Sequence, residues 1–292
     1  MSSQRIGVGV CILPERPWRE ASELWRQAED LGFDHAWTYD HLTWGGLPNS
    51  PWYAAFPTLA AAAAVTSRIG LGTFVASPNT HHPLQLVREA LSLHDLSAGR
   101  FLLGIGAGGD LDASLSAPGL STAQRSARFR EFAAVVADSL RHDGLDHAGE
   151  HYQFEGAGSL PGPPNAGLEA NLPLLIAANG PRALATAAAH GHGWITYGGR
   201  AESDQAWWQL IADVAQRMDE AVAASRRARP LRRILGLDSA PTYPFSGVDR
   251  FEDALGRALE CGFTDVVCTW PRPTNPYAGS MSTVQEVAAR LF

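Results

Sequence analysis

The chain has 292 residues, and its 23 basic residues against 30 acidic ones give a formal net charge of −7. All of the basic residues are arginine, and the chain contains no lysine. Enzymes that form a Schiff base on lysine and phosphate loops that end in Gly-Lys-Ser/Thr are therefore excluded. The acidic balance also argues against a protein whose main partner is nucleic acid.

The composition, 45% hydrophobic and 18% charged, is that of a globular protein. Cys11, Cys261 and Cys268 form no closely spaced pair, which argues against a disulfide framework and favours a reducing compartment. Residues 1–5 are polar and unlike a signal peptide, and the most apolar run, 56–65, is too short to span a bilayer. We therefore expect a cytoplasmic protein with no membrane partner.

Short apolar or β-branched runs alternate with helical patterns along the whole chain. In the first half, strands are expected at residues 6–13, 35–38, 69–75 and 101–106, and helices at residues 18–31, 58–66, 83–96 and 122–140. In the second half, strands are expected at 174–178, 194–197, 233–237 and 265–269, and helices begin near Pro181, Glu202, Val248 and Ser282.

These eight strand–helix units of about 36 residues each predict an α/β protein with a (β/α)8 barrel, a TIM barrel, in a single domain over residues 1–292. The alternative fold is a doubly wound open sheet. Residues 142–172 interrupt the rhythm and are rich in Pro and Gly. We expect this insertion to run over the C-terminal face of the barrel.

Polar residues directly after a barrel strand are the candidates for catalysis, because barrel active sites lie at the C-terminal strand ends. Asp40 and His41 follow the second strand and form a pair that can act as acid and base. The alternative is that Asp40 caps a turn and His41 only packs. Trp44 and Trp52, in the same loop, are suited to the wall of an apolar pocket.

Two other patterns are less informative. His81 and His82 follow the third strand, but adjacent histidines cannot easily face one metal, and no metal site is predicted. Residues 104–109 match G-x-G-x-x-G, yet Pro118 and Gly119 follow soon after, so we expect no helix at the glycines and no Rossmann site. The glycines instead suit a backbone that approaches a flat ligand closely.

The residues after the fifth strand are suited to binding an anion. Small residues lead into a helix whose backbone N–H groups and dipole favour a phosphate, and an arginine lies in its first turn. The segment comprises Ala177, Ala178, Asn179, Gly180, Pro181 and Arg182. Arg200, after the sixth strand, could add a second contact, and the alternative for both is an ordinary surface turn.

Several motifs taken together resemble those of the luciferase-like flavin and deazaflavin oxidoreductases, over essentially the whole chain. They are Gly32-Phe33-Asp34 with Trp37 and Asp40-His41, the segments 66–73 and 97–108, Asn179-Gly180-Pro181-Arg182 and Gly193-Trp194. The resemblance implies a barrel that binds coenzyme F420, a deazaflavin, or alternatively FMN. The positions that match cofactor contacts are Asp40, Ser77, Ala107, Gly108 and Tyr197, with residues 177–182 around the phosphate.

The resemblance also implies roles for single residues. A non-proline cis peptide behind the cofactor ring falls at Phe74-Val75, His41 matches a histidine near the reactive ring carbon, and Trp44 lines the substrate pocket. Gly109, with Asp110 beside it, stands where the sugar-phosphate dehydrogenases have a glutamate acid, and Arg200 stands at their phosphate-binding lysine. The missing glutamate and lysine argue against the sugar-phosphate activity. The expected cofactor class is unaffected.

These observations predict an F420-dependent oxidoreductase that transfers a hydride to or from a small organic substrate, with reduction favoured, and with His41 or Asp40 handling the proton. The alternatives are an FMN-dependent monooxygenase and a barrel that carries a cofactor without catalysis. A homodimer is expected from the resemblance.

Overall fold

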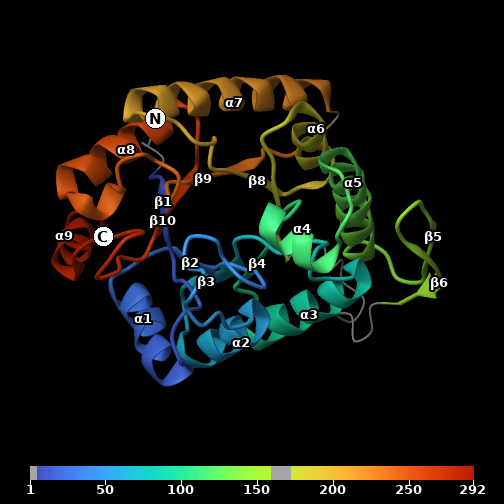
Figure 1. Cartoon of the computed structure of the whole chain (residues 1–292), viewed down its shortest axis with the longest axis horizontal. Coiled ribbons are helices and arrows are strands. Elements are labelled where there is room, and N and C mark those ends of the chain that lie inside the picture. Colours follow the sequence, from blue (N-terminus) through green and yellow to red (C-terminus); the bar gives the residue numbers. More distant parts are fainter. Residues whose placement is uncertain (1–4, 159–171, 226) are drawn as a thin grey trace.

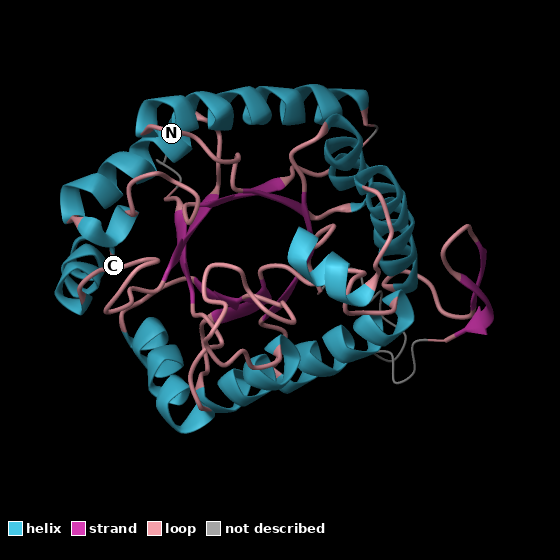
Figure 2. Cartoon of the chain, viewed as in Figure 1, coloured by secondary structure: helices cyan, strands magenta, loops and turns pink. Residues whose placement is uncertain are grey.

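The computed structural model describes residues 5–158, 172–225 and 227–292. Eight parallel strands close into a barrel surrounded by helices (Figures 1 and 2), in the order β1-β10-β9-β8-β7-β4-β3-β2. Because β1 pairs with β10, the sheet has no open edge, and the doubly wound alternative is excluded. The barrel strands are β1 (Gly7–Cys11), β2 (His35–Thr38), β3 (Gly70–Thr73), β4 (Phe101–Ile105), β7 (Leu174–Ala177), β8 (Gly193–Thr196), β9 (Arg232–Gly236) and β10 (Asp265–Thr269).

The outer helices follow the strands in the predicted alternation. They are α1 (Trp18–Asp30), α2 (Ala55–Val65), α3 (Pro83–Leu96), α5 (Thr122–Ser139), α6 (Pro181–His190), α7 (Asp204–Ala224), α8 (Val248–Glu260) and α9 (Met281–Leu291). The 3-10 turn η2 (Pro244–Ser246) precedes α8. Helix α2 begins three residues earlier than predicted, because Pro57 lies in its first turn, where a missing N–H costs no hydrogen bond.

A short helix, α4 (Asp110–Ser116), begins directly after the glycine segment, and the prediction of no helix there was wrong. Asp110 and Asp112 lie in its first turn, where carboxylates interact favourably with the helix dipole. Pro118 and Gly119 lie just beyond its end, so they limit its length without preventing it from forming.

The insertion after α5 does not lie where it was predicted, over the C-terminal face of the barrel. Its described part forms an antiparallel hairpin of β5 (Leu145–Ala148) and β6 (Gln153–Ala157), which lies on the outer side of α5 (Figure 1). Glu131 of α5 holds it there by accepting hydrogen bonds from the Tyr152 amide (2.9 Å) and from His147 Nε2 (3.0 Å). The hairpin therefore does not cover the barrel opening, and residues 159–171 lie outside the described residues.

Glycines in β1 and β3 give room to large side chains inside the barrel. A Cβ atom on Gly9 would lie 1.8 Å from His35 Nδ1, and one on Gly72 would lie 2.3 Å from the Trp37 ring. His35 and Trp37 are accordingly buried in the lumen, joined by a hydrogen bond from Trp37 Nε1 to His35 Nδ1 (2.6 Å). In the described parts of the chain, no helix has the length and apolar character needed to cross a bilayer.

Candidate active site

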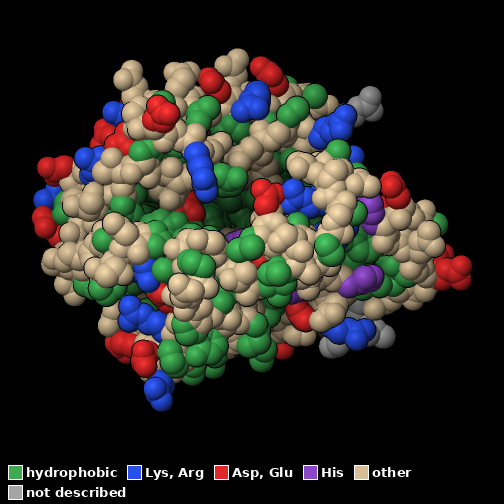
Figure 3. Space-filling view, in the orientation of Figure 1, with side chains coloured by type: hydrophobic (Ala, Val, Ile, Leu, Met, Phe, Trp, Pro, Cys, Tyr) green, Lys and Arg blue, Asp and Glu red, His purple; other side chains and the backbone are tan. Residues whose placement is uncertain are grey.

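The loops that follow β2, β3 and β4 gather at the C-terminal end of the barrel. Figure 2 shows α4 and the loop after β2 in front of the barrel opening. Figure 3 shows a hollow at the centre of this face, with apolar side chains at its bottom. Of the predicted residues, Asp40, His41, Trp44 and Ser77 come together here.

His41 is held by a carboxylate from α4. Its Nδ1 lies 2.5 Å from Asp112 Oδ2, and the backbone amide of Leu42 donates to Asp112 Oδ1 at 3.0 Å. Asp112 is 1% exposed, whereas the side chain of His41 is 22% exposed. The histidine thus has one nitrogen tied to a buried group and the other available to the opening.

Asp40 has a different partner from its neighbour. Its Oδ2 lies 2.6 Å from Nε2 of His81, and Nδ1 of His81 lies 3.7 Å from Glu89. Burial lowers the pKa of His81, but the hydrogen bond and charge of Asp40 together with Glu89 outweigh it and raise the pKa above its ordinary value. His81 is therefore the partner that fixes the position of the Asp40 side chain, whereas His41 is held by Asp112.

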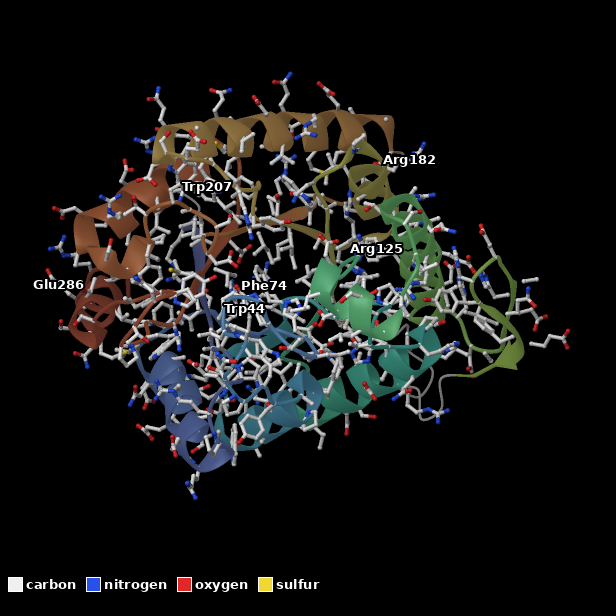
Figure 4. All side chains as sticks on the ribbon, in the orientation of Figure 1. Trp44, Phe74, Arg125, Arg182, Trp207 and Glu286 are labelled. Carbon is white, nitrogen blue, oxygen red and sulfur yellow. The ribbon has the colours of Figure 1, made fainter. Side chains whose placement is uncertain are left out.

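An aromatic wall surrounds His41. The Tyr39 ring stacks on Phe74 with centroids 6.4 Å apart, and Trp44 stacks on Tyr277 at 6.0 Å. Trp52 packs against Trp44 at 5.8 Å and against His41 at 6.4 Å. Figure 4 shows Trp44 and Phe74 inside the ring of helices. The reacting end of a substrate near His41 would therefore meet mainly apolar surface.

Asp238, which follows β9, lies beneath this wall. Its Oδ2 accepts a hydrogen bond from the Tyr39 hydroxyl, and its Oδ1 is buried without a hydrogen-bond partner. Burial raises the pKa of Asp238, and the Tyr39 hydroxyl opposes this rise only in part. No motif in the sequence marks this residue, because a lone aspartate after a strand is common.

The glycine segment packs closely on the loop after β3. The peptide bond between Phe74 and Val75 is cis, at the position implied by the resemblance. A Cβ on Gly106 would lie 2.5 Å from Val75 and 3.3 Å from Ala177, so these residues form one surface inside the barrel. Gly108 has a φ of +81°, and a Cβ there would lie 2.7 Å from Ser77 Oγ.

Asn79 extends this surface towards α5. It donates through Nδ2 to the carbonyl of Gly109 (3.3 Å) and accepts at Oδ1 from Arg128 (2.5 Å). Ala107, the predicted cofactor contact between these glycines, is exposed at the same place. Ser77, Ala107 and Gly108 are therefore neighbours, as a shared binding role requires.

The predicted anion site lies at the start of α6. Gly180 is its N-cap, no side chain caps the helix, and a Cβ at Gly180 would meet open space. Asn179 is fixed by the Thr196 hydroxyl, which donates to its Oδ1. Pro181 has no N–H, so the free N–H groups of the first turn that are open to an anion begin with that of Arg182.

The arginines and the acidic residue predicted for binding lie further out. Figure 4 shows Arg182 on the outer side of the helix ring, and both Arg200 and Tyr197 are exposed. The Asp110 side chain is 92% exposed and pairs with Arg125 (2.7 Å; Arg125 is labelled in Figure 4). Asp110 is thus at the surface, and Asp112 is the α4 carboxylate that reaches His41.

In the parts of the chain that the structure describes, no cluster of three or more His, Cys, Asp or Glu could hold a metal ion. Arg16, Trp18, Tyr53 and their neighbours line a separate apolar groove between α1 and α2.

Comparison with known proteins identifies relatives over most of the chain. The sequence profile of the luciferase-like monooxygenases matches residues 4–238. An F420-dependent glucose-6-phosphate dehydrogenase of Beutenbergia cavernae is 34% identical over 180 residues, which are 59% of this chain and 51% of the relative. The 5,10-methylenetetrahydromethanopterin reductase of Archaeoglobus fulgidus is 29% identical over 187 residues, 63% of this chain and 51% of the relative.

The chain thus spans about half the length of these two curated relatives. A solved structure of an F420-dependent secondary alcohol dehydrogenase with an F420–acetone adduct matches with a TM-score of 0.80 at 13% identity. That match covers 99% of this chain and 98% of the other and shows a shared fold. The profile match over residues 4–238 establishes that the chain belongs to the luciferase-like monooxygenase family.

Proposed function

We propose that this protein is a coenzyme F420-dependent oxidoreductase that transfers a hydride to a small organic substrate. The observation that carries the proposal is the placement of His41 at the barrel opening, between an aromatic wall and the close-packed surface of Val75, Gly106 and Gly108. The relatives that use F420 support the choice of cofactor.

The described residues fit such a cofactor at both ends. The uncapped first turn of α6 offers backbone N–H groups to a phosphate, in open space beside Gly180. Val75, Ala177 and the glycines at 106 and 108 present little side-chain bulk, so a flat ring can lie against them. Ser77 and Asn79 add a hydroxyl and an amide at the edge of this surface.

In the mechanism, the bound deazaflavin would supply the hydride. The aromatic residues of the wall exclude water from the reacting atoms and orient the substrate. His41 exchanges the proton that accompanies hydride transfer, through the nitrogen that Asp112 does not hold. Asp40, held by His81, orients the cofactor or substrate by hydrogen bonds.

For the substrate, the apolar wall favours an unsaturated or iminium-like organic molecule over a sugar phosphate. The acidic side chain that the sugar-phosphate dehydrogenases carry is absent at Gly109, and the cation at position 200 is an exposed arginine.

We also propose a cytoplasmic location, in keeping with the free thiols of Cys11, Cys261 and Cys268, and a homodimeric assembly.

The test is a titration of the purified protein with F420 and with FMN, followed by oxidation of reduced F420 in the presence of enones, imines and glucose 6-phosphate. We expect tight F420 binding and turnover with an unsaturated acceptor. His41→Ala should retain F420 binding and lose at least about a hundredfold in kcat. Tight FMN binding without F420 affinity would exclude this function.

An FMN-dependent monooxygenase is the second candidate, because the family whose profile matches is described by that activity. Oxygen consumption driven by supplied reduced FMN would support it. A deazaflavin is a hydride carrier that activates oxygen poorly, so a protein that turns over reduced F420 without oxygen uptake is not such a monooxygenase.

A further inference from the structure

Both carboxylate oxygens of Asp112 form hydrogen bonds with the same short segment, His41 and Leu42. Oδ1 accepts the amide of Leu42, and Oδ2 binds the Nδ1 nitrogen of the preceding residue, His41. The group is 1% exposed, so water does not compete for either oxygen. Asp112 thereby fixes the backbone after His41 and the direction of its ring together.

This contact also determines which ring nitrogen carries the proton. An ionised carboxylate can only accept a hydrogen bond, so Nδ1 of His41 must be the donor. In the neutral imidazole Nε2 then has a free lone pair, whereas a free histidine prefers its proton on Nε2. The partner of one nitrogen thus sets the chemistry of the other.

We propose that Asp112 is the positioning residue of this active site, and that α4 contributes to catalysis by delivering it to His41. His41 is presented to the substrate with Nε2 ready to take a proton, and after protonation the positive ring remains paired with Asp112. The tautomer is a property of the chain itself, while the effect on turnover rests on the proposed function.

Position 109 offers an independent route to the same contact. A Cβ atom at Gly109 would lie 3.7 Å from His41 Cε1 and 3.8 Å from Asp112 Oδ2, which is ordinary packing distance. The φ of Gly109 is −77°, a value that any residue adopts. A glutamate there can therefore bring a carboxylate towards the ring once Asp112 is removed.

The first experiment measures the tautomer of His41 by 15N NMR in the full chain, with His41→Gln to assign the signal. We expect a proton on Nδ1 in the neutral wild-type ring and a shift towards the Nε2 form in Asp112→Ala. Asp213→Asn, an exposed aspartate on α7, should leave the signal unchanged. An Nε2 proton in the wild type, or no shift in Asp112→Ala, would overturn the proposal.

The second experiment measures turnover of reduced F420 with whichever acceptor is turned over in the screen of enones and imines. Asp112→Ala should lower kcat by about tenfold to a hundredfold with F420 affinity within about twofold. The kcat of Asp112→Asn should lie between those of the wild type and Asp112→Ala, since the amide oxygen of Asn can still accept a hydrogen bond from Nδ1 of His41. The double variant Gly109→Glu/Asp112→Ala should recover part of kcat, which a merely structural role of Asp112 would not predict.

The outcomes separate the two proposals. If the wild type binds and turns over no F420, the proposed function fails, while the NMR result still decides the role of Asp112 in orienting the ring. If the tautomer changes in Asp112→Ala but kcat and its pH profile do not, the catalytic role of Asp112 is wrong. A folded double variant with no gain over Asp112→Ala also counts against it.

Discussion

At the scale of single residues, the two ends of the barrel use buried carboxylates for different purposes. Asp265, at the start of β10, is 5% exposed and accepts two hydrogen bonds from Arg232 (2.9 and 2.6 Å) and one contact from His35 Nε2 (3.1 Å). Because Nδ1 of His35 accepts from Trp37, its Nε2 is the donor to Asp265. At this end of the barrel the buried carboxylate stabilises the fold, whereas Asp112, at the opposite end, holds His41.

Asp265→Asn should destabilise the fold by about 3 kcal/mol near neutral pH, because it leaves part of a buried charge network unpaired. Burial raises the pKa of Asp265, but Arg232 and His35 outweigh it and hold the pKa below its ordinary value. The stabilisation is therefore present above the ordinary aspartate range and is lost as the pH falls below it. Urea unfolding should show the difference from wild type shrinking in acid, with Asp253→Asn as an exposed control.

Trp44 belongs to the aromatic wall and should contribute to substrate binding. Trp44→Ala removes a ring that contacts Trp52, Tyr39 and Tyr277, and with it apolar surface against which a substrate can pack. We expect a rise in the KM of an apolar acceptor of about tenfold with F420 affinity little changed. Trp208→Ala, on outer helix α7, is the control. An unchanged KM in Trp44→Ala would place the substrate elsewhere.

At the scale of elements, α1 is joined to the turn before β3 by Glu29. Its carboxylate accepts the backbone amides of Ser67 (2.9 Å), Arg68 (2.6 Å) and Ile69 (2.9 Å). Burial acts to raise the pKa of Glu29, but these hydrogen bonds outweigh it and lower the pKa from 4.5 to about 2.

Glu29→Gln should therefore destabilise the protein by about 1–2 kcal/mol, since a neutral amide cannot accept all of these bonds as strongly. The contribution of Glu29 is fully present above pH 4.5 and is lost as the pH falls towards about 2. Denaturant unfolding at several pH values measures it. Glu23→Gln, an exposed change on the same helix, should have little effect at any pH.

The first turn of α6 makes a separate prediction about the cofactor. Gly180→Asp places a carboxylate in open space at the N-cap, where it should cap the helix and repel a phosphate. We expect unchanged or slightly higher thermal stability and at least about tenfold weaker F420 binding. Gly180→Asn caps the helix without charge and should weaken binding less. Equal affinity in wild type and Gly180→Asp would place the phosphate away from α6.

At the scale of the whole molecule, closure of the barrel joins the two ends of the chain. Strand β1 pairs with β10 along five residue pairs, so neither half of the sheet is complete alone. We expect one cooperative thermal transition for the full chain, with a midpoint that rises with F420 concentration because the ligand binds the folded state. Calorimetry with and without F420 measures this, and two separate transitions would contradict a single domain. Sedimentation of the same samples tests the homodimer.

The sequence alone predicted the order of the barrel strands and outer helices and the barrel end at which the candidate residues Asp40 and His41 lie. Hydrophobic period and cap residues are local signals, so β2, α3 and β10 were predicted with their observed ends, and Asp40 and His41 were placed after β2. The prediction from sequence was wrong at α4, because Pro118 and Gly119 lie beyond the end of that helix and do not prevent it. It was also wrong at the insertion, whose hairpin packs outside α5.

Only the tertiary structure decided the partners of the adjacent pair Asp40 and His41. His41 meets Asp112 across 71 residues, and Asp40 meets His81 across 41. The side-chain contacts that set a proton's position depend on how loops from different strands converge, and no local pattern encodes that convergence. The sequence placed Asp40 and His41 after β2, and the convergence of the loops after β2, β3 and β4 decided which buried partner each of them meets.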